Sequence, residues 1–468
     1  MDDQLKILGG YRQAAVNPPQ VQGFSGRSVD GALDGGEAEL QTQSKRAVIS
    51  AFLGFFVDMF DIFLPVIALA PAQKYFQPDD VPASAIIIAE SLIVASTLIG
   101  RPVGSVLFGY VSDRIGRRPT TLITLTGFGV CIILMGLLPG YRTWGMASLY
   151  MLIALRFISG CFLGGEYSGA NVLAMETAPR EKRGPYSGII QSGYPLAFVA
   201  ISALTFLMLA IFPSGSPDSP YAVYGWRIPF FIGGALALGF IVPFRKTVKE
   251  SPAWEATRGK RAGIGEVLSG KAGRRLAQVC LVILGFWFTT FSAQVGMLPA
   301  ELIHVIHLKP AQMTITIMVA SAFLTVGYLL VAVLSQYLGR RFMIALMAIL
   351  TGTAGLYAYY LLLSAPGKFS TIVVLATIVV VLLTSVWGVT TCYLVENFPT
   401  RVRAAAFGIA FGVPVIIPSL YGTYQGFLAR IVPEPYTVLL MTGFGALCML
   451  VGALIGNEGK DVDLKLLS

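Results

Sequence analysis

The segment GYVSDRIGRR, residues 109–118, decides the fold class of this chain. It is a short charged loop that separates two long apolar runs. Part of it returns as QYLGRR at residues 336–341, so that the two Gly-Arg-Arg units are 223 residues apart. A copy at nearly half the chain length indicates that the protein consists of two similar halves.

A second motif repeats with almost the same offset. Glu176 and Arg183 bracket a proline-containing loop, and Glu396 and Arg403 bracket the corresponding loop 220 residues later. Each copy follows an apolar run, as the first motif does. Two independent motifs therefore predict the same internal duplication.

The composition places these halves in a membrane. The chain has 468 residues, of which 55% are hydrophobic and 13% charged, and its mean hydropathy is +0.71. Soluble domains carry about 25% charged residues. Apolar runs of about 20 residues or more, the length needed to cross a bilayer, recur along the chain. This pattern excludes a soluble multidomain enzyme.

The predicted fold is all-α, with twelve membrane-spanning helices in two pseudo-symmetric six-helix bundles. The expected spans are residues 47–69, 84–110, 119–139, 145–176, 184–212, 225–246, 275–298, 310–334, 342–363, 370–396, 402–428 and 435–456. The expected domains are a disordered cytoplasmic tail at 1–44, an N-terminal bundle at 45–246, a cytoplasmic linker at 247–274, a C-terminal bundle at 275–456 and a cytoplasmic tail at 457–468.

The basic residues predict the orientation. Of the 34 Lys and Arg residues, 26 fall in the two tails and in the loops on the same side as residues 109–118, and six fall on the opposite side. The side rich in basic residues faces the cytoplasm. We therefore expect a multi-pass cell-membrane protein, in a bacterial inner membrane or a plasma membrane, with both termini cytoplasmic. The net charge of +9 reports orientation and not nucleic-acid binding.

The motif at residues 109–118 resembles the signature of the major facilitator superfamily. Further segments resemble its metabolite:proton symporter branch and, more distantly, the sugar porters: Arg101-Pro102-x-Gly104, Arg156-x-x-x-Gly160-x-x-x-Gly164-Gly165-Glu166-Tyr167, Gly225-Trp226-Arg227-Ile228-Pro229-Phe230 and Glu250-Ser251-Pro252. The segment Asp58-Met59-Phe60-Asp61 is similar to one in the aromatic-acid:proton symporters. The resemblance covers about residues 45–456.

The resemblance and the charges predict a conformational latch at the cytoplasmic end. Asp113 can accept hydrogen bonds from the N-terminal amides of a neighbouring helix, where a carboxylate is favoured. The second copy has Gln336 where the family often has Asp, so any charge relay there is weakened. The expected gating residues are Gly109, Asp113, Arg114, Gly116, Arg117, Arg118, Glu176, Arg183, Glu396 and Arg403.

Five charged residues lie deep within the first-half spans, near the middle of the membrane. They are the carboxylates Asp58, Asp61 and Glu166 and the guanidiniums Arg101 and Arg156. An ionisable group at this depth costs about 2.5–3.5 kcal/mol on insertion scales, so each needs a partner or a function. Structural salt bridges are the alternative interpretation of each residue taken singly.

The charges do not balance, because three carboxylates face two guanidiniums. A carboxylate with too few partners in a low dielectric can cycle through its neutral form, as a proton carrier must. We expect Asp61, Asp58 and Glu166 to couple protons, and Arg156 and Arg101 to bind substrate. In the family fold, the first and fourth spans line the central cavity, which would bring Asp61 towards Arg156.

The second half has no charge in the cores of its predicted spans and must contribute neutral groups to a site. The candidates for substrate binding are Trp287, Gln294, Trp387, Tyr393, Tyr421 and Tyr424. Packing or interfacial anchoring is the alternative role of such aromatic residues. Gln191 in the fifth span joins the candidates, because sugar porters have a similar substrate-binding glutamine. Glycines at four-residue spacing, such as Gly160 and Gly164, are expected to let helices approach closely.

The function predicted from these features is proton-coupled symport of a small organic solute, preferably a carboxylate, by alternating access. The alternatives are an uncoupled facilitator or exchanger of a zwitterion, sugar or polyol, and a transporter-like sensor that signals through its N-terminal tail. No nucleophile–base set, phosphate loop or metal-ligand cluster indicates an enzyme, a metal or a cofactor. The expected partners are the solute, a proton and the bilayer, for a functional monomer.

Overall fold

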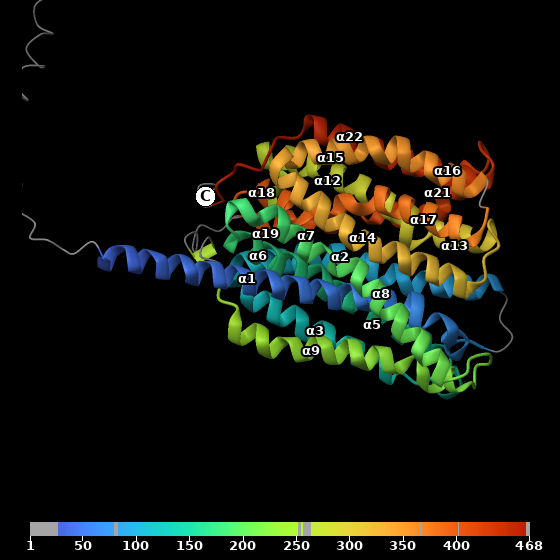
Figure 1. The fold of residues 1–468 in the computed structure, drawn as a ribbon. Helices are drawn as coiled ribbons and strands as arrows, with labels where there is room; N and C mark the ends of the chain where they lie inside the picture. Colours follow the sequence, from blue (N-terminus) through green and yellow to red (C-terminus); the bar gives the residue numbers. More distant parts are fainter. Residues whose placement is uncertain are drawn as a thin grey trace, which may run out of the picture. The chain divides into compact units, whose positions relative to one another are not determined.

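The computed structural model describes residues 27–78, 83–250, 254–255, 264–364, 367–400 and 402–464. Residues Gln43–Ser468 form one compact unit, to which the following description applies. Over the described part of that unit the secondary structure is helical, without β-strands, as predicted. In Figure 1 its long helices run side by side, with α1 to α9 largely on one side and α12 to α22 largely on the other.

The first six spans form the N-terminal bundle. In chain order they are α1 (Arg27–Phe63) with η1 (Leu64–Ala68); α2 (Ala83–Ile115); α3 (Arg117–Leu137); α5 (Met146–Glu166) with η3 (Tyr167–Asn171) and α6 (Val172–Thr177); α7 (Arg183–Gln191) with α8 (Gly193–Ile211); and η5 (Tyr221–Gly225) with α9 (Arg227–Thr247). The connecting elements are η2 (Ala70–Phe76), α4 (Tyr141–Trp144) and η4 (Arg180–Lys182).

The last six spans form the C-terminal bundle. They are α12 (Gly270–Thr290) with η6 (Phe291–Val295) and α13 (Met297–His304); α14 (Pro310–Leu338); α15 (Arg340–Leu350) with η7 (Thr351–Gly355) and α16 (Leu356–Ser364); α17 (Phe369–Thr384) with η8 (Ser385–Val389) and α18 (Thr390–Glu396); α19 (Arg403–Gly412) with α20 (Ile416–Ser419) and α21 (Tyr421–Leu428); and α22 (Thr437–Ile455). The short elements α11 (Ile264–Leu268) and η9 (Glu434–Tyr436) precede the first and the last span.

Length and apolarity agree with this count. Ten helical stretches among the described residues are long and apolar enough to cross a membrane, and the pair Arg403–Ser419 and Tyr421–Leu428, bent by 41°, adds an eleventh. Helix α2, with 33 residues, completes twelve. Large apolar side chains such as Val326 and Ile455, each 62% exposed, cover the outside, where lipid would solvate them.

The N-terminal tail differs in part from its prediction. Helix α1 begins at Arg27, so residues 27–44 are helical and not disordered. These residues include good helix formers such as Ala32, Leu33 and Glu37. A helix already nucleated in the membrane can extend through them at little cost, because adding residues to a helix is easier than starting one. Residues 1–26 lie outside the described part.

Helices α2 and α5 pack at very close range, and the predicted glycines allow it. An added Cβ would lie 1.8 Å from the carbonyl oxygen of Cys161 at Gly104, and 2.1 Å from that of Arg101 at Gly164. At Gly160 it would lie 2.3 Å from the carbonyl oxygen of Thr97. This contact fixes the distance between Arg101 on α2 and Arg156 on α5.

Candidate functional site

A central cavity lies between the two bundles. It encloses about 620 Å³ of empty space, including the part open to solvent. Its walls come from α1 and η1, α2, α5, α8, α12 and η6. The lining residues are Met59, Ile62, Phe63, Val66, Thr97, Leu98, Arg101, Arg156, Tyr194, Phe198, Trp287, Phe291, Gln294 and Val295.

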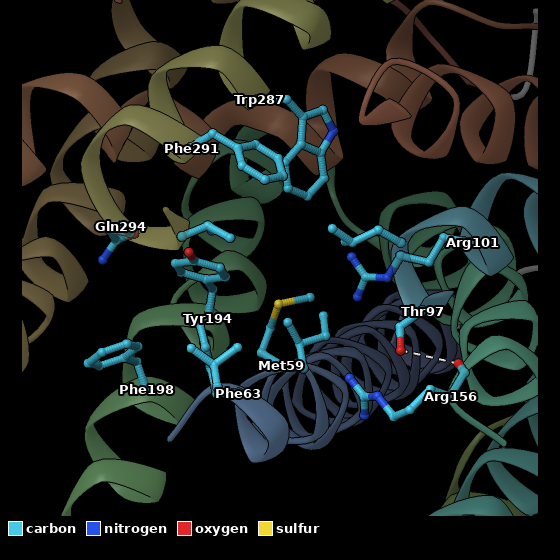
Figure 2. A pocket seen from close by; sticks show the side chains of 14 residues that line it. Met59, Phe63, Thr97, Arg101, Arg156, Tyr194, Phe198, Trp287, Phe291 and Gln294 are labelled. Carbon is cyan, nitrogen blue, oxygen red and sulfur yellow. Dashed lines mark hydrogen bonds between the residues drawn. The ribbon is translucent and has the colours of Figure 1, made fainter. Parts of the chain in front are cut away.

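Two arginines are the charged residues among these lining side chains. Figure 2 shows Arg101 and Arg156 together on one side of the cavity, with Phe198 and Gln294 across from them. The hydroxyl of Thr97 on α2 donates a hydrogen bond of 3.2 Å to the backbone oxygen of Arg156 on α5, which ties the two arginine-bearing helices together. The cavity is therefore positively charged on one wall and largely apolar on the rest.

Each cavity arginine is paired with an aspartate of α1. Nη1 of Arg156 donates to Oδ2 of Asp61 at 2.9 Å and to its backbone oxygen at 3.2 Å. Nη2 of Arg101 lies 3.6 Å from Oδ2 of Asp58. All four residues are at most 2% exposed. Asp61 does not line the cavity itself, so Arg156 lies between this carboxylate and the cavity.

A second space of about 270 Å³ shares Met59, Tyr194 and Trp287 with the central cavity. It is also lined by Gln191 and Trp387, two of the predicted substrate-binding residues. Both are hydrogen-bonded within the protein. Nε2 of Gln191 donates to Thr391 at 3.1 Å, and Nε1 of Trp387 donates to Thr290 at 2.7 Å.

Aromatic rings of the C-terminal bundle form the wall between the two spaces. The ring centroids of Trp287 and Trp387 are 4.9 Å apart, and Phe411 lies within 5.9 Å of both. Nε1 of Trp287 donates to the backbone oxygen of Phe411 at 3.1 Å. The indole N–H groups are thus used internally, and the rings present their faces or edges to a solute.

The end of the molecule that carries Asp113 and Gln336, here called the signature end, is bridged by hydrogen bonds between the bundles. Oδ2 of Asp113 accepts the backbone N–H of Ala405, in the first turn of α19, at 3.1 Å. Oδ1 of Asp113 accepts from Arg117 at 2.7 Å. The carboxylate therefore joins its own bundle to the N-terminus of a helix in the other.

The second copy makes a neutral version of this contact. Oε1 of Gln336 accepts the backbone N–H of Gly184, in the first turn of α7, at 2.9 Å. It also accepts from Nη2 of Arg340 at 2.8 Å. Gln336 thus takes the place of Asp113 in the pseudo-symmetric bundle without its charge.

The two Glu…Arg repeats pair crosswise between the bundles. Glu176 accepts from Arg403 at 2.7 Å, and Arg183 lies 4.0 Å from Glu396. Within each bundle the same carboxylates face the signature arginines. Arg117 lies 3.8 Å from Glu176, and Arg340 donates to Glu396 at 3.2 Å.

Two further glutamates hold the signature turns. Oε1 and Oε2 of Glu250 accept the backbone N–H groups of Arg117 and Arg118 at 3.0 and 3.1 Å, at the N-terminus of α3. Glu458 does the same for Arg340 and Arg341 at the N-terminus of α15, at 2.9 and 3.0 Å. A carboxylate is stabilised at the N-terminus of a helix. The preceding glycines have φ of +112° at 116 and +100° at 339, which favours glycine.

The segment after α22 lies against both bundles at the signature end. Arg183 donates to the backbone oxygen of Val462 at 2.8 Å, and Thr400 donates to that of Leu464 at 3.2 Å. Arg180 forms an ion pair of 2.7 Å with Asp461. The side chain of Leu464 is buried, with 2% exposure. We refer to residues 458–464 as the C-terminal strap.

The model of the Major Facilitator Superfamily matches residues 51–413, which is most of the chain and includes both signature copies. The chain belongs to the Major Facilitator Superfamily. It is therefore a membrane-spanning transporter and not an enzyme.

Several bacterial transporters of this superfamily are similar in sequence. The inner membrane metabolite transport protein YhjE of Escherichia coli is 28% identical over 81% of this chain and 86% of its own length. The proline/betaine transporter of Salmonella typhimurium is 27% identical over 82% and 78%. The shikimate transporter of Escherichia coli is 32% identical over 51% and 55%.

Solved structures of the superfamily share the fold. The proton:xylose symporter XylE bound to 6-bromo-6-deoxy-D-glucose has a TM-score of 0.76 at 19% identity and covers 91% of this chain and 98% of its own. FucP in the outward conformation has a TM-score of 0.66 at 14% identity and covers 87% and 97%. At these identities the likeness concerns the fold alone.

Several predicted site residues of this major facilitator lie away from both cavities described above. The Tyr393 hydroxyl accepts a hydrogen bond of 2.8 Å from Gln278, and its ring does not line either space. Tyr421 and Tyr424 pack on Phe291 and Phe288, behind the cavity wall. These three tyrosines have packing contacts in place of the predicted substrate contact.

Two other predicted residues also need comment. Arg114 is exposed and stacks over the ring of Tyr110 at 4.1 Å, so it takes no part in the contacts between the bundles described here. Glu166 ends α5, and its side chain lies outside the described part of the structure. Gly109, by contrast, packs where predicted, since an added Cβ would lie 2.9 Å from Cα of Ala405 in the other bundle.

Sequence reasoning missed some residues of the site. Tyr194 lines both spaces, is 8% exposed and lies three residues after Gln191, a spacing that could have drawn attention to it. Glu301 lies in α13 and is buried, although the predicted span ended at residue 298. Among the described residues no group of three or more His, Cys, Asp or Glu could hold a metal ion.

Proposed function

We propose that this transporter couples the uptake of a small organic solute bearing a carboxylate to the movement of a proton. The observation that carries the proposal is the buried pair of Asp61 and Arg156, in which the arginine lines the cavity and the aspartate lies behind it. Arginine stays protonated in proteins, so Asp61 is the partner that can gain or lose a proton.

The pair supports an exchange of partners. A solute carboxylate can bind the Arg156 guanidinium through two parallel hydrogen bonds, as planar carboxylates do. Asp61 would then lose its partner while it remains buried. An unpaired buried carboxylate is costly, and protonation removes that cost. One solute carboxylate and one proton would therefore load together.

Arg101 and Asp58 provide a second pair on the same wall. Their closest atoms are 3.6 Å apart, compared with 2.9 Å for Arg156 and Asp61. The Arg101 side chain lines the cavity, so its positive charge adds to the attraction for an anion. We assign Arg101 to solute attraction and Asp61 to proton carriage, with Asp58 as partner of Arg101.

The opposite wall suits an apolar or cationic group. Trp287 and Phe291 line the cavity, and aromatic faces attract quaternary ammonium groups. A zwitterion could place its carboxylate at Arg156 and its cationic group against Trp287. Betaines are named among the substrates of the related proline/betaine transporters, which makes a zwitterion the second candidate.

Transport would proceed by alternating access. The signature end, which carries most of the basic loops, would face the cytoplasm together with both termini. Hydrogen bonds between the bundles cluster at that end, so this state would admit a solute from the opposite, outer side. Rocking of the bundles would break those bonds and open the cavity inward.

The test begins with a thermal-shift screen of purified protein against carboxylates, zwitterions and polyols. The best stabiliser is then used in vesicles, in uptake driven by an imposed pH gradient and in counterflow exchange. Asp61→Asn should abolish gradient-driven accumulation and retain counterflow, whereas Arg156→Lys should weaken both because the bidentate contact is lost.

The matched control is Asp58→Asn, which removes a carboxylate at similar depth. It should retain gradient-driven accumulation in proportion to its counterflow. Equal loss of both activities in Asp61→Asn would contradict a proton role and indicate a structural one. Wild-type uptake that ignores the pH gradient and uncouplers would favour an uncoupled facilitator.

A further inference from the structure

One buried carboxylate of the C-terminal bundle takes no part in the site described above. Glu301 lies in α13, the eight-residue helix Met297–His304 that ends the seventh span. It is 6% exposed, and neither of its carboxylate oxygens makes a hydrogen bond with a described residue. No ion pair with a described Lys, Arg or His was found for it either.

The elements around Glu301 offer it no positive charge. The packed segments η6 and α14 contain no Asp, Glu, Lys, Arg or His, and α16 contains none. His304, His307 and Lys309 follow on the chain, but all three are exposed. An ionised carboxylate would therefore be buried here without a compensating charge, which is costly.

The polar group that acts on Glu301 is the hydroxyl of Tyr359 in α16. This hydroxyl donates its single hydrogen to the backbone oxygen of Ser292 at 2.9 Å, and Tyr359 is fully buried. A backbone carbonyl can only accept, so the direction of that bond is fixed. Towards Glu301, the tyrosine oxygen can therefore only accept a hydrogen bond.

The hydrogen count selects one state of the carboxyl group. A carboxylate has no hydrogen to give, so an ionised Glu301 would face the lone pairs of Tyr359. A protonated Glu301 can donate its O–H to them. We propose that Glu301 is a second proton-binding site of the transporter, occupied in this conformation and independent of Asp61.

The position of Glu301 links its proton to the cavity wall. Ser292, the acceptor of Tyr359, lies in the π-helical segment η6, which also carries Phe291 and Gln294 into the cavity. Helix α13 begins after a break at Gly296, where the backbone has φ −138° and ψ −66°. Movement of α13 at this break would expose Glu301 to water, release its proton and withdraw the contact that supports η6.

The proposal can be tested without knowing the solute. Purified wild-type protein and Glu301→Gln in lipid nanodiscs are compared by infrared difference spectroscopy at neutral pH, where a protonated carboxyl group absorbs apart from carboxylates. The wild type should show one protonated-carboxyl band that Glu301→Gln lacks. Raising the pH should remove this band from the wild type. Asp61→Asn should leave it unchanged, which separates this proposal from the function proposed above.

A second variant keeps the test decisive if Glu301→Gln does not fold. Tyr359→Phe retains Glu301 but removes the oxygen that accepts its hydrogen bond. The Glu301 band should persist and shift towards the position of a free carboxyl group. The proposal is wrong if Glu301→Gln removes only carboxylate absorption, or if Tyr359→Phe leaves the protonated-carboxyl bands where they are in the wild type.

Discussion

Arg403 of the C-terminal bundle donates a hydrogen bond of 2.7 Å to Glu176 of the N-terminal bundle. The pseudo-symmetric residues, Arg183 and Glu396, are 4.0 Å apart. The signature copies show the same imbalance, because charged Asp113 and neutral Gln336 make equivalent contacts. The closed signature end therefore depends mainly on one of two similar sets of contacts.

Glu176→Gln should shift the transporter towards the state that is open at the signature end. Both Glu176 and Arg403 are buried, and removing one partner of a buried ion pair costs about 3–5 kcal/mol. Part of that cost falls on the closed state alone, since the pair joins the two bundles. The distance between spin labels on the two bundles at this end should increase.

The control is Asp218→Asn, which breaks an exposed ion pair with Arg142 at the opposite end. Exposed pairs contribute about 0–1 kcal/mol, so the label distances should not change. Unchanged distances in Glu176→Gln as well would show that the pair does not hold the bundles together.

Asp113→Asn should impair transport without reducing membrane insertion. The substitution removes the charge from two hydrogen bonds, to Ala405 and to Arg117. Hydrogen bonds that involve a charged group contribute about 1.5–3 kcal/mol, so the closed population should fall about tenfold or more. Initial uptake per inserted transporter in vesicles measures the effect. Arg114→Gln, at an exposed neighbouring position, should transport normally, and normal turnover in Asp113→Asn would remove the latch role.

Gly104→Ala should destabilise the protein and disturb the site. Its new Cβ would overlap the backbone of Cys161, so α2 and α5 must separate, at a cost of about 1–3 kcal/mol for overpacking. That separation also moves Arg101 relative to Arg156. Gly239→Ala in α9 is the matched control, because nothing lies within 4 Å of its added Cβ. Thermal unfolding should occur at a lower temperature in the first variant and at an equal or higher temperature in the second.

A chain that ends at Lys460 should close less firmly at the signature end. It lacks the backbone oxygens of Val462 and Leu464, which accept hydrogen bonds from Arg183, Thr400 and Arg403. Each lost bond to an arginine leaves a buried guanidinium less satisfied. The same spin-label distances should lengthen. Asp461→Asn alone removes only an exposed ion pair and should leave them near the wild-type values.

Charge was the most reliable guide to this molecule in its sequence. A membrane-buried charge must be accounted for, so Asp61 and Arg156 stood out, and the structure contains their contact. The repeats likewise predicted the two bundles. Glycine spacing predicted the close packing of α2 on α5, which backbone sterics explain.

Neutral residues could not be placed in the same way. Several spans contain π-helical or 3₁₀ segments, such as η6 and η8, which rotate the faces of the helix that follows. Counting along a regular helix therefore assigned Tyr393 to the cavity. The continuation of the seventh span through η6 and α13 also carried Glu301 into a buried position that the predicted span ending at residue 298 did not include.

The C-terminal strap has a consequence for biosynthesis. Residues 458–464 leave the ribosome after every membrane helix, yet they supply the carboxylate that holds the α15 turn and the carbonyls that bind Arg183 and Arg403. A nascent chain can therefore insert and assemble its helices before it can complete the closed end. The permeability barrier on that side is finished last, by residues outside the bilayer.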